Sequence, residues 1–321
     1  MKRAAFLKGA GALALAPAVG RAQGAWPDKQ IRMVIPFAAG GTTDLLARAL
    51  GQHMTQAWGQ PVVADNRAGA NGVVAGEIVA KSAGDGYTLL MVAMGHAINP
   101  LLYKKLPYDG TADFTPISLV ATFPQLVLVR PALKAGTIAE LIALAKSASP
   151  PLTYASGGNG SSQHLAGALF EHMAGITMTH VAYKGGNPAQ LDLMAGNVDM
   201  MITQSNSKDL IATGKMRPLV VSSAKRSSFY PELPTVDEAG VPGYQSVAWY
   251  GLIGPKGMSS ELLKKIADEA ARAAATEGAK SVVALQGGDM VASTPPEFAS
   301  FIEAERARYE AIVRDAGMTV D

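Results

Sequence analysis

The chain has 321 residues, of which 48% are hydrophobic and 17% are charged, and it contains no cysteine. This composition is typical of a folded globular protein with a substantial core, and the length suggests about two domains. The absence of cysteine excludes disulfides, thiolate metal sites and thiol catalysis. The sequence also lacks a P-loop lysine motif, a complete dinucleotide fingerprint and a helical pair of zinc-binding histidines, so we expect neither a metal nor an organic cofactor.

The N-terminus has the pattern of a secretory signal peptide. An Ala-rich apolar run ends near Val19, and basic residues surround its start (Lys2, Arg3 and Lys8). The run is too short for a typical membrane-spanning helix and has the length of a signal-peptide core. We expect residues 1–24 to be removed after export to the periplasm. Cleavage at Ala22-Gln23-Gly24 competes with cleavage at Ala18-Val19-Gly20, and both general and twin-arginine export fit.

Removal of this segment changes the charge balance. The whole chain has a formal net charge of +2, but its first 24 residues hold four basic residues and no acidic one. The mature chain therefore has 24 basic and 26 acidic residues, a net charge of −2. No basic stripe remains that would indicate nucleic-acid binding.

From Trp26 onward, short apolar runs alternate with helical patterns. The first half of the mature chain contains predicted helices at 43–57 and 73–81, and predicted strands at 31–35, 62–64, 87–93 and 117–121. Such alternation indicates an α/β fold with a parallel sheet covered by helices on both faces. Ligands of these folds bind at the carboxyl ends of the strands.

One strand end carries a glycine-rich turn at residues 36–44, PFAAGGTTD. Thr42 or Thr43 is a suitable N-cap for the following helix, and Asp44 lies in its first turn. A strand, a glycine turn and a helix N-terminus together present backbone N–H groups that bind anions without Arg or Lys. The alternative is that these glycines only shape a strand-to-helix turn.

A second unit begins near Leu126 and repeats this arrangement. A capping box at Thr137 predicts a helix to about Ser147. Predicted strands follow at 152–155, 179–182, 198–202 and 219–222. A second glycine-rich turn at 156–162 follows the first of these strands and precedes a helical pattern. The C-terminal third contains a predicted strand at 246–253, a helix from Ser259 to about Glu277, and a last helix opened by a capping box at Thr294.

Several apparent catalytic motifs do not hold up. Two S-x-x-K matches, at 205–208 and 222–225, lack their companion motifs, and no G-x-S-x-G elbow occurs. Three histidines are spaced eight apart, which is not the spacing of a helical zinc pair. Of these, His164 follows the second glycine turn and is placed to reach a site there, whereas His172 and His180 are expected on the surface or in the core.

The glycine-rich turn at 36–44 closely resembles the first signature of Bug-type substrate-binding proteins of tripartite tricarboxylate transporters. The resemblance continues in the same order along the chain through NRAGANG (66–72), GDGYTL (84–89), YASGGNGS (154–161), YKGGNPA (183–189), LPTVDEAGVPGY (233–244) and WYG (249–251). These segments span nearly the whole mature chain, so chance is a poor explanation for them.

The resemblance implies a two-lobed type II periplasmic-binding-protein clamshell, with each lobe a mostly parallel sheet flanked by helices. One lobe would comprise residues 25–125 plus 247–321, and the other residues 126–246. The chain would cross between them near 123–127 and 245–248. It also implies a monomeric, non-catalytic solute-binding protein that delivers a small organic acid, a di- or tricarboxylate of aliphatic or aromatic kind, to membrane subunits of the transporter. A ligand-sensing partner of a signalling receptor and a periplasmic enzyme are the alternatives.

The resemblance also implies which residues hold the carboxylates. From one lobe these are Ala39, Gly40, Gly41, Thr42 and Asp44. From the other lobe they are Ser156, Gly157, Asn159, Gly160, Ser161 and His164. Weaker candidates are Tyr183, Lys184 and Gly185, together with His96 and Asn99 in the segment before Pro100, which we expect to be a loop.

One segment departs from the family pattern. After the strand at 198–202, many relatives carry a Phe-Asp pair, whereas this chain has Ile202-Thr203-Gln204-Ser205-Asn206. The missing acid removes like-charge repulsion and would admit a different or more anionic substrate. Neutral drift at a strand end is the alternative.

Overall fold

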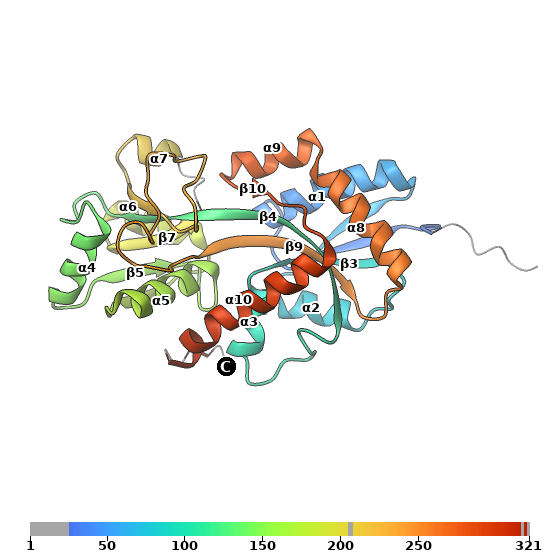
Figure 1. The fold of residues 1–321 in the computed structure, drawn as a ribbon, viewed down its shortest axis with the longest axis horizontal. Coiled ribbons are helices and arrows are strands. Elements are labelled where there is room, and N and C mark those ends of the chain that lie inside the picture. Colours follow the sequence, from blue (N-terminus) through green and yellow to red (C-terminus); the bar gives the residue numbers. More distant parts are fainter. Residues whose placement is uncertain (1–25, 205–207, 316–317, 320–321) are drawn as a thin grey trace, which may run out of the picture.

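The computed structural model describes residues 26–204, 208–315 and 318–319, so the predicted signal peptide and residues 205–207 lie outside the described chain. Figure 1 shows an elongated α/β molecule in which helices flank a mixed, curled sheet. The sheet has ten strands in the order β2-β1-β3-β9-β4-β7-β5-β6, with β8 and β10 paired to β4. The predicted α/β fold class is confirmed.

We call the part built on β1, β2 and β3 lobe 1. Its three strands are mutually parallel and cover Ile31–Ile35, Val62–Asn66 and Thr88–Ala93. Alternate side chains of β1 enter different apolar clusters, because successive residues of a strand point to opposite faces. Ile31, Met33 and Ile35 pack with α1 and α8, whereas Val34 packs on the opposite side with α2. The helices of this lobe are α1 (Thr42–Trp58), α2 (Val73–Ala80), α3 (Gly95–Leu102), α8 (Ser260–Ala274) and α9 (Glu277–Leu285), with a short 3₁₀ turn at Ala70–Gly72.

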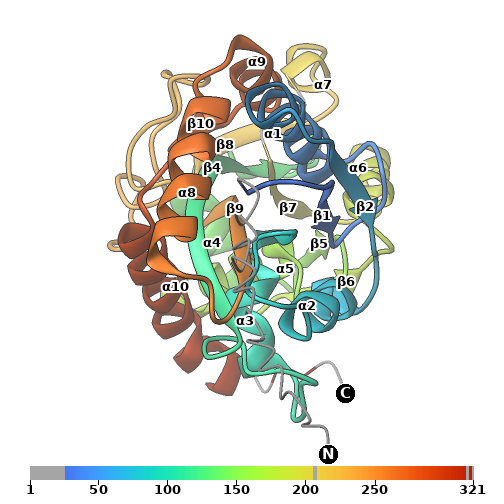
Figure 2. The same ribbon diagram turned by 90° about the vertical axis from the view of Figure 1, so that its right-hand side faces the viewer.

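We call the part built on β5, β6 and β7 lobe 2. These strands are also mutually parallel and cover Thr153–Ser156, Thr179–Ala182 and Met200–Gln204. The fourth strand of this lobe, β8 (Arg217–Val221), pairs antiparallel with β4. The helices are α4 (Ile138–Ser147), α5 (Ser162–Ala174), α6 (Gly186–Ala195) and α7 (Lys208–Ala212). Figure 2, which views the molecule along its length, shows how the two lobes lie one behind the other.

Two long strands connect the lobes, β4 (Phe114–Val129) and β9 (Val247–Pro255). β4 pairs with β9 up to Pro124, and from Gln125 onward it pairs with β7 and β8. This change of partner falls within the stretch 123–127 that was predicted as the first crossing. The limits of the two lobes, 25–125 plus 247–321 and 126–246, stay a prediction.

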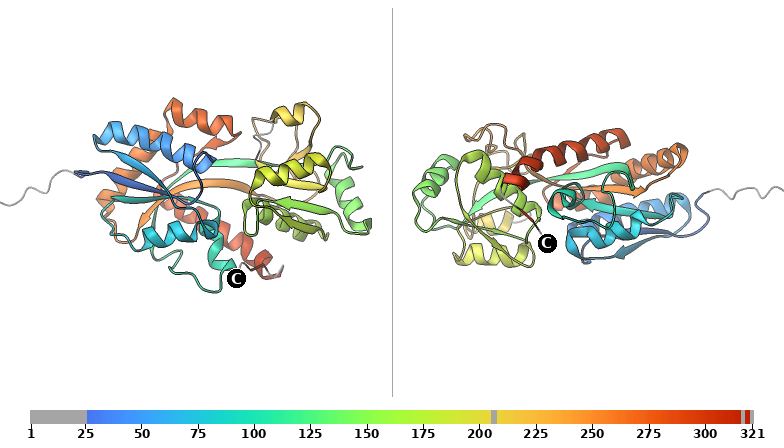
Figure 3. Two further views of the ribbon diagram at one scale, coloured as in Figure 1. Left: turned by 180° about the vertical axis from the view of Figure 1, so that it is seen from behind. Right: turned by 90° about the horizontal axis from the view of Figure 1, so that it is seen from below.

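Buried hydrogen bonds hold the two connections together. The Gln125 N–H donates to Ser222 Oγ over 2.9 Å, and the Ser246 N–H donates to the Ser222 carbonyl over 2.9 Å. The last helix, α10 (Pro295–Asp315), runs alongside β9 (Figures 1 and 3). Its Glu305 accepts a hydrogen bond of 3.2 Å from Trp249 Nε1. The long β4 and β9 and this helix therefore form a common spine for both lobes. The short β10 (Asp289–Met290) adds to the edge of β4.

Three features differ from the sequence-based expectations. The sheet is mixed and not mostly parallel, because four strand pairs are parallel and five are antiparallel. The helix predicted from Ser259 to about Glu277 is present as α8 with Ser259 as its N-cap, but it ends at Ala274, because Thr276 caps a new helix by accepting from the Ala279 N–H. The segment before Pro100 is α3 and not a loop. In the described ranges, no helix combines the length and the apolar character that crossing a membrane would require.

Candidate functional site

A cleft of about 480 Å³ lies between the lobes, where the N-termini of α1, α5 and α6 meet β9. Lobe 1 contributes Phe37, Gly41, Thr42, Thr43, Asn71, Ala93, Met94 and Gly95 to its walls, and β9 contributes Ala248, Trp249 and Tyr250. Lobe 2 contributes Gly157, Asn159, Gly160, Ser161, Ser162, Gln163, Gly185 and Gly186. The cleft therefore opens at the carboxyl ends of β1 and β5, as expected for this fold class.

The helix on the lobe 1 side begins without a side-chain cap. Its N-cap is Gly41, with φ −80° and ψ 168°, and not Thr42 or Thr43 as the sequence suggested. Glycine has no side-chain oxygen that could accept from the first-turn N–H groups, so these groups face the cleft without a side-chain cap. An uncapped helix N-terminus attracts an anion through its aligned N–H dipoles.

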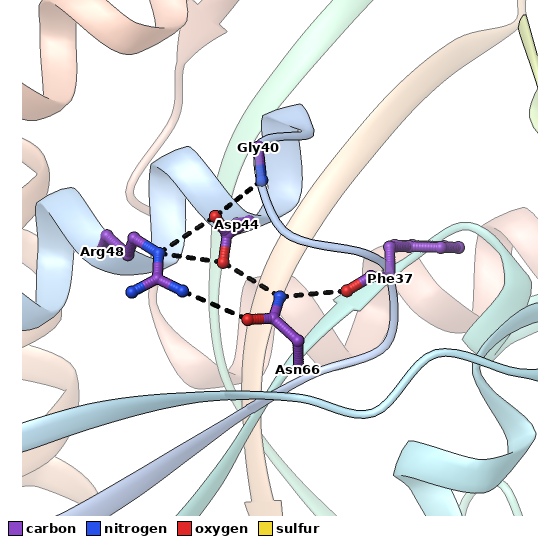
Figure 4. Close-up of polar contacts among 5 residues, drawn as sticks. All are labelled: Phe37, Gly40, Asp44, Arg48 and Asn66. Carbon is purple, nitrogen blue, oxygen red and sulfur yellow. Dashed lines mark hydrogen bonds and ion pairs between the residues drawn. The ribbon is translucent and has the colours of Figure 1, made fainter.

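A charged cluster holds this first glycine loop from behind (Figure 4). One carboxylate oxygen of Asp44 accepts from the Gly40 N–H over 2.9 Å, and Arg48 Nε lies 3.0 Å from both oxygens. The Asn66 amide donates to Asp44 over 3.0 Å and to the Phe37 carbonyl over 3.0 Å. Burial opposes ionisation of Asp44, but these hydrogen bonds outweigh it and lower its pKa to about 2. Asp44 is thus an anchor of the loop and does not line the cleft.

The loop of lobe 2 is held by neutral groups. Gln163 Oε1 accepts from the Gly157 N–H over 2.7 Å, and His164 Nδ1 accepts from the Gly160 N–H over 3.1 Å. Ser161 caps α5 by accepting from the His164 N–H. The predicted ligand residue His164 therefore stabilises the loop from behind and does not line the cleft.

A pair of stacked imidazoles underlies this second loop. The rings of His164 and His180 are 3.9 Å apart with an interplanar angle of 7°. His180 Nε2 lies 2.6 Å from Ser156 Oγ, which also accepts from the Gly158 N–H. Burial, together with the neighbouring His180, lowers the pKa of His164 to about 3, and burial also lowers the pKa of His180. Ser156 is fully buried, so this Ser–His pair shapes the loop and is not exposed to a substrate.

A direct contact joins the two lobes across the cleft, from the 3₁₀ turn at Ala70–Gly72 to the second glycine loop. Asn71 Nδ2 in lobe 1 donates to the Gly160 carbonyl in lobe 2 over 3.1 Å. Asn99 orients this amide, because its Oδ1 accepts from Asn71 Nδ2 over 3.2 Å and its Nδ2 donates to the Asn71 carbonyl over 3.1 Å. Asn71 has a φ of +49°, a left-handed conformation that Asn tolerates better than most residues. In the sequence, Asn71 belongs to the signature at 66–72 and was not predicted as a site residue.

No Asp, Glu, Lys or Arg lines this cleft among the residues described. Across the part of the chain that the structure describes, no three or more His, Cys, Asp or Glu side chains are grouped so that they could hold a metal ion. Attraction for an anion must therefore come from backbone dipoles, hydroxyls and carboxamides. Such groups bind a carboxylate through hydrogen bonds that they donate.

The predicted site residues fall into three groups. Those that line the cleft are Gly41, Thr42, Gly157, Asn159, Gly160, Ser161 and Gly185. Those that support the loops from behind are Asp44, Ser156 and His164, while Gly40 lines a neighbouring compartment. Those that do not line the cleft are Ala39, His96, Asn99, Tyr183 and Lys184.

Two residues of the last group contact side chains away from the cleft. Tyr183 donates to Asp192 over 2.6 Å, and the His96 ring packs edge-on against Phe114. Tyr250 and Gln163 also line the cleft but were not predicted from the sequence, although Tyr250 lies in the signature at 249–251. Whether these two side chains line the cleft depends on the order of the strands and on the direction in which α5 faces. A local sequence pattern contains neither.

Comparison with known proteins identifies the class. Residues 46–318 match the model of the TctC family, described as the tripartite tricarboxylate transporter family receptor. The chain belongs to this family of periplasmic solute-binding proteins, and the resemblance to Bug-type proteins is confirmed.

The similarity to individual known proteins extends over nearly the whole chain. Protein BugT of Bordetella pertussis is 34% identical over 295 residues, which is 91% of this chain and 90% of BugT. The structure of Rpa4515 from R. palustris with adipate is 36% identical, has a TM-score of 0.79 and covers 92% of this chain and 99% of its own. The structure of MatC (Rpa3494) from Rhodopseudomonas palustris with bound malate is 30% identical, has a TM-score of 0.76 and covers 90% of this chain and 100% of its own.

Proposed function

We propose that this protein is exported to the periplasm, where residues 1–24 are removed. The mature protein captures a small organic carboxylate between its lobes and delivers it to the membrane subunits of a tripartite tricarboxylate-type transporter. The observation that carries the proposal is the convergence of helix N-termini from both lobes on one cleft without a charged side chain. This arrangement suits a carboxylate, because the N–H dipoles of the helices share its charge.

In this proposal, the ligand carboxylate lies between Thr42 of lobe 1 and Ser161 of lobe 2. Adipate and malate, the ligands of the two structural relatives, are both dicarboxylic acids, which supports this ligand class. Neither lobe alone completes the site, so the ligand stabilises the closed arrangement by binding it better than an open one. The protein acts as a monomer and needs neither a metal nor an organic cofactor for binding.

The test is a binding screen on the mature chain with mono-, di- and tricarboxylates, aliphatic and aromatic. Saturation at a hundredfold excess over the dissociation constant should raise the free energy of unfolding by about 2.7 kcal/mol. Small-angle scattering with a binding acid should report a more compact particle. Binding confined to sugars or cations would refute the proposal. Cross-linking in whole cells tests delivery: capture of transporter subunits supports it, and capture of a signalling receptor instead would favour sensing.

A further inference from the structure

The connecting strand β9 contributes three residues to the wall of the cleft, Ala248, Trp249 and Tyr250. The side chain of Ala248 has no polar atom, and the Trp249 indole N–H already donates to Glu305 of α10 over 3.2 Å. The hydroxyl of Tyr250 is therefore the polar side-chain group that β9 can offer to a ligand. This hydroxyl is not among the predicted site residues.

The Tyr250 hydroxyl lies where the two lobes meet. Its strand pairs with β3 of lobe 1, with Tyr250 opposite Ala93. From lobe 2, Gln204 at the end of β7 donates from Nε2 to the hydroxyl over 3.1 Å. The hydroxyls of Thr42 and Thr43, in the first turn of α1, are close enough to influence its pKa. The Tyr250 hydroxyl thus lies beside the helix N-terminus to which the proposed function assigns the carboxylate.

This hydroxyl is protonated and has one hydrogen to donate. Burial raises the pKa of Tyr250, although hydrogen bonds with neighbouring side chains, Gln204 first among them, oppose the rise. The hydrogen bond accepted from Gln204 uses a lone pair of the oxygen, so the O–H can still donate in another direction. The ring of Tyr250 packs edge-on against Phe123 of β4, with ring centroids 5.3 Å apart. Both ends of the side chain are therefore held in place.

A carboxylate accepts hydrogen bonds and donates none, so its binding depends on donors in the cleft. Two of the side-chain donors there are already engaged, because Gln163 donates to a threonine hydroxyl and Asn71 donates to a backbone carbonyl. An O–H that donates to an anion forms one of the stronger hydrogen bonds in proteins. The hydrogen bond from Gln204 polarises the Tyr250 hydroxyl and strengthens it as a donor.

Gln204 belongs to the segment in which this chain departs from the family pattern. Its side chain also lines a second compartment of about 340 Å³ that adjoins the cleft. The other carboxamides of that compartment are Gln163, Asn187, Gln190 and Gln286. A carboxamide at position 204 donates to Tyr250 and places no negative charge beside a bound acid. A carboxylate in its place would accept the hydrogen of Tyr250 and leave none for the ligand.

We propose that Tyr250 is a ligand-binding residue whose hydroxyl donates a hydrogen bond to the ligand carboxylate, and that Gln204 of lobe 2 positions this hydroxyl. The proposal rests on the proposed function, since it takes the carboxylate to lie beside the N-terminus of α1. Tyr250 is on the connecting strand and Gln204 is in lobe 2, so one hydroxyl links the bound carboxylate to both lobes. The ligand thereby favours the closed arrangement.

The test is calorimetric titration of the mature protein and its variants with adipate, malate, hexanoate, benzoate and citrate. Tyr250→Phe keeps the ring and removes the hydroxyl, and it should weaken the binding of each acid that binds by at least tenfold. Gln204→Leu removes only the positioning hydrogen bond and should weaken binding about threefold. Equal losses in the two variants would mean that these side chains only join the lobes, and would overturn the ligand contact. Unchanged affinity in folded Tyr250→Phe protein would overturn it as well.

Two matched controls report on the substitutions themselves. Tyr87→Phe removes a hydroxyl that bonds to Asp28 outside the cleft, and Gln56→Leu changes the exposed face of α1. Neither variant should change the affinity for any of the five acids. A loss in Tyr87→Phe protein as large as that in Tyr250→Phe protein would overturn the assignment of Tyr250.

A crystal structure of the unaltered protein with the tightest-binding of the five acids tests the contact without a variant. A carboxylate oxygen should lie within hydrogen-bond distance of the Tyr250 hydroxyl. A carboxylate bound elsewhere in the cleft would overturn this inference and leave the proposed function intact. Failure of all five acids to bind the unaltered protein would instead overturn the proposed function, and this inference with it.

Discussion

The two glycine loops both line the cleft, yet they are held by opposite means. The loop of lobe 1 is fixed by a buried carboxylate with a cation beside it, Asp44 with Arg48. The loop of lobe 2 is fixed by neutral acceptors, the Gln163 carboxamide and the His164 imidazole. Each anchor accepts a hydrogen bond from a backbone N–H group at the rear of its loop. Similar loop sequences therefore do not imply similar electrostatics. We expect the two lobes to respond differently to mutation and to acid.

The largest difference should appear when each anchor is removed. Asp44→Ala leaves the Gly40 N–H, Arg48 and Asn66 without their common acceptor and should lower the free energy of unfolding by about 3 kcal/mol. His164→Ala removes one neutral acceptor and should cost about 1 kcal/mol. Urea denaturation measures both. Asp268→Ala, which breaks an exposed ion pair with Lys264, is the control and should cost less than 0.5 kcal/mol or so. Equal losses for Asp44→Ala and His164→Ala would contradict the comparison.

Side chains added to the two loops should separate binding from stability. Gly41 has a φ of −80°, and an added Cβ would meet only the Ala38 carbonyl at 3.8 Å. Gly41→Val should therefore keep the folded stability while its side chain obstructs the cleft, weakening ligand affinity by roughly 2 kcal/mol. Gly160 has a φ of +72°, so Gly160→Ala should also lower stability, by about 1 kcal/mol. Thermal unfolding and calorimetry together measure these effects. Normal binding by folded Gly41→Val protein would show that the first loop is not part of the site.

Acid should weaken the two anchors in different pH ranges. Because the pKa of His164 falls from 6.5 to about 3 on folding, the unfolded chain binds more protons between these values. Stability from this group is complete above pH 6.5 and is lost as the pH falls through that window, by about 1 kcal/mol near pH 5.5. Asp44 loses its contribution only between about pH 4 and 2. His164→Asn keeps an acceptor near the Gly160 N–H, so its unfolding free energy should vary less between pH 6.5 and 4.5. An identical pH profile for the variant would rule out this role.

The smallest effect should come from the hydrogen bond by which Asn71 joins lobe 1 to the loop of lobe 2. Asn71→Gly keeps the left-handed backbone but removes the hydrogen bond to the Gly160 carbonyl. The closed arrangement loses about 1 kcal/mol, so ligand affinity should fall about fivefold. Small-angle scattering should show a less compact unliganded particle. An unchanged affinity and size would mean that Asn71 does not hold the lobes together.

The sequence by itself was sufficient for the features that depend on neighbouring residues. Alternating strand and helix patterns predicted the α/β class, and the glycine turns before α1 and α5 marked both loops of the cleft. These signals are local, because a strand end, a glycine turn and a helix start occupy fewer than ten residues or so. The net charge of −2 expected after removal of residues 1–24 also gave no indication of nucleic-acid binding. The ordered signatures identified the family, which the match over residues 46–318 confirmed.

Tertiary packing determines which of these groups line the cleft and which turn into the protein. Asp44 and His164 follow their glycines closely in sequence and resemble ligand residues, yet packing turns both behind the loops. Asn71 donates to the Gly160 carbonyl, and Gln204 donates to the Tyr250 hydroxyl. Both contacts join segments far apart in the chain, and they form only because β4 and β9 connect the two lobes. The physical reason is that hydrogen bonds between distant segments depend on strand order and side-chain direction, and a local pattern contains neither. The uncharged cleft and its carboxamide-lined extension follow from that assembly.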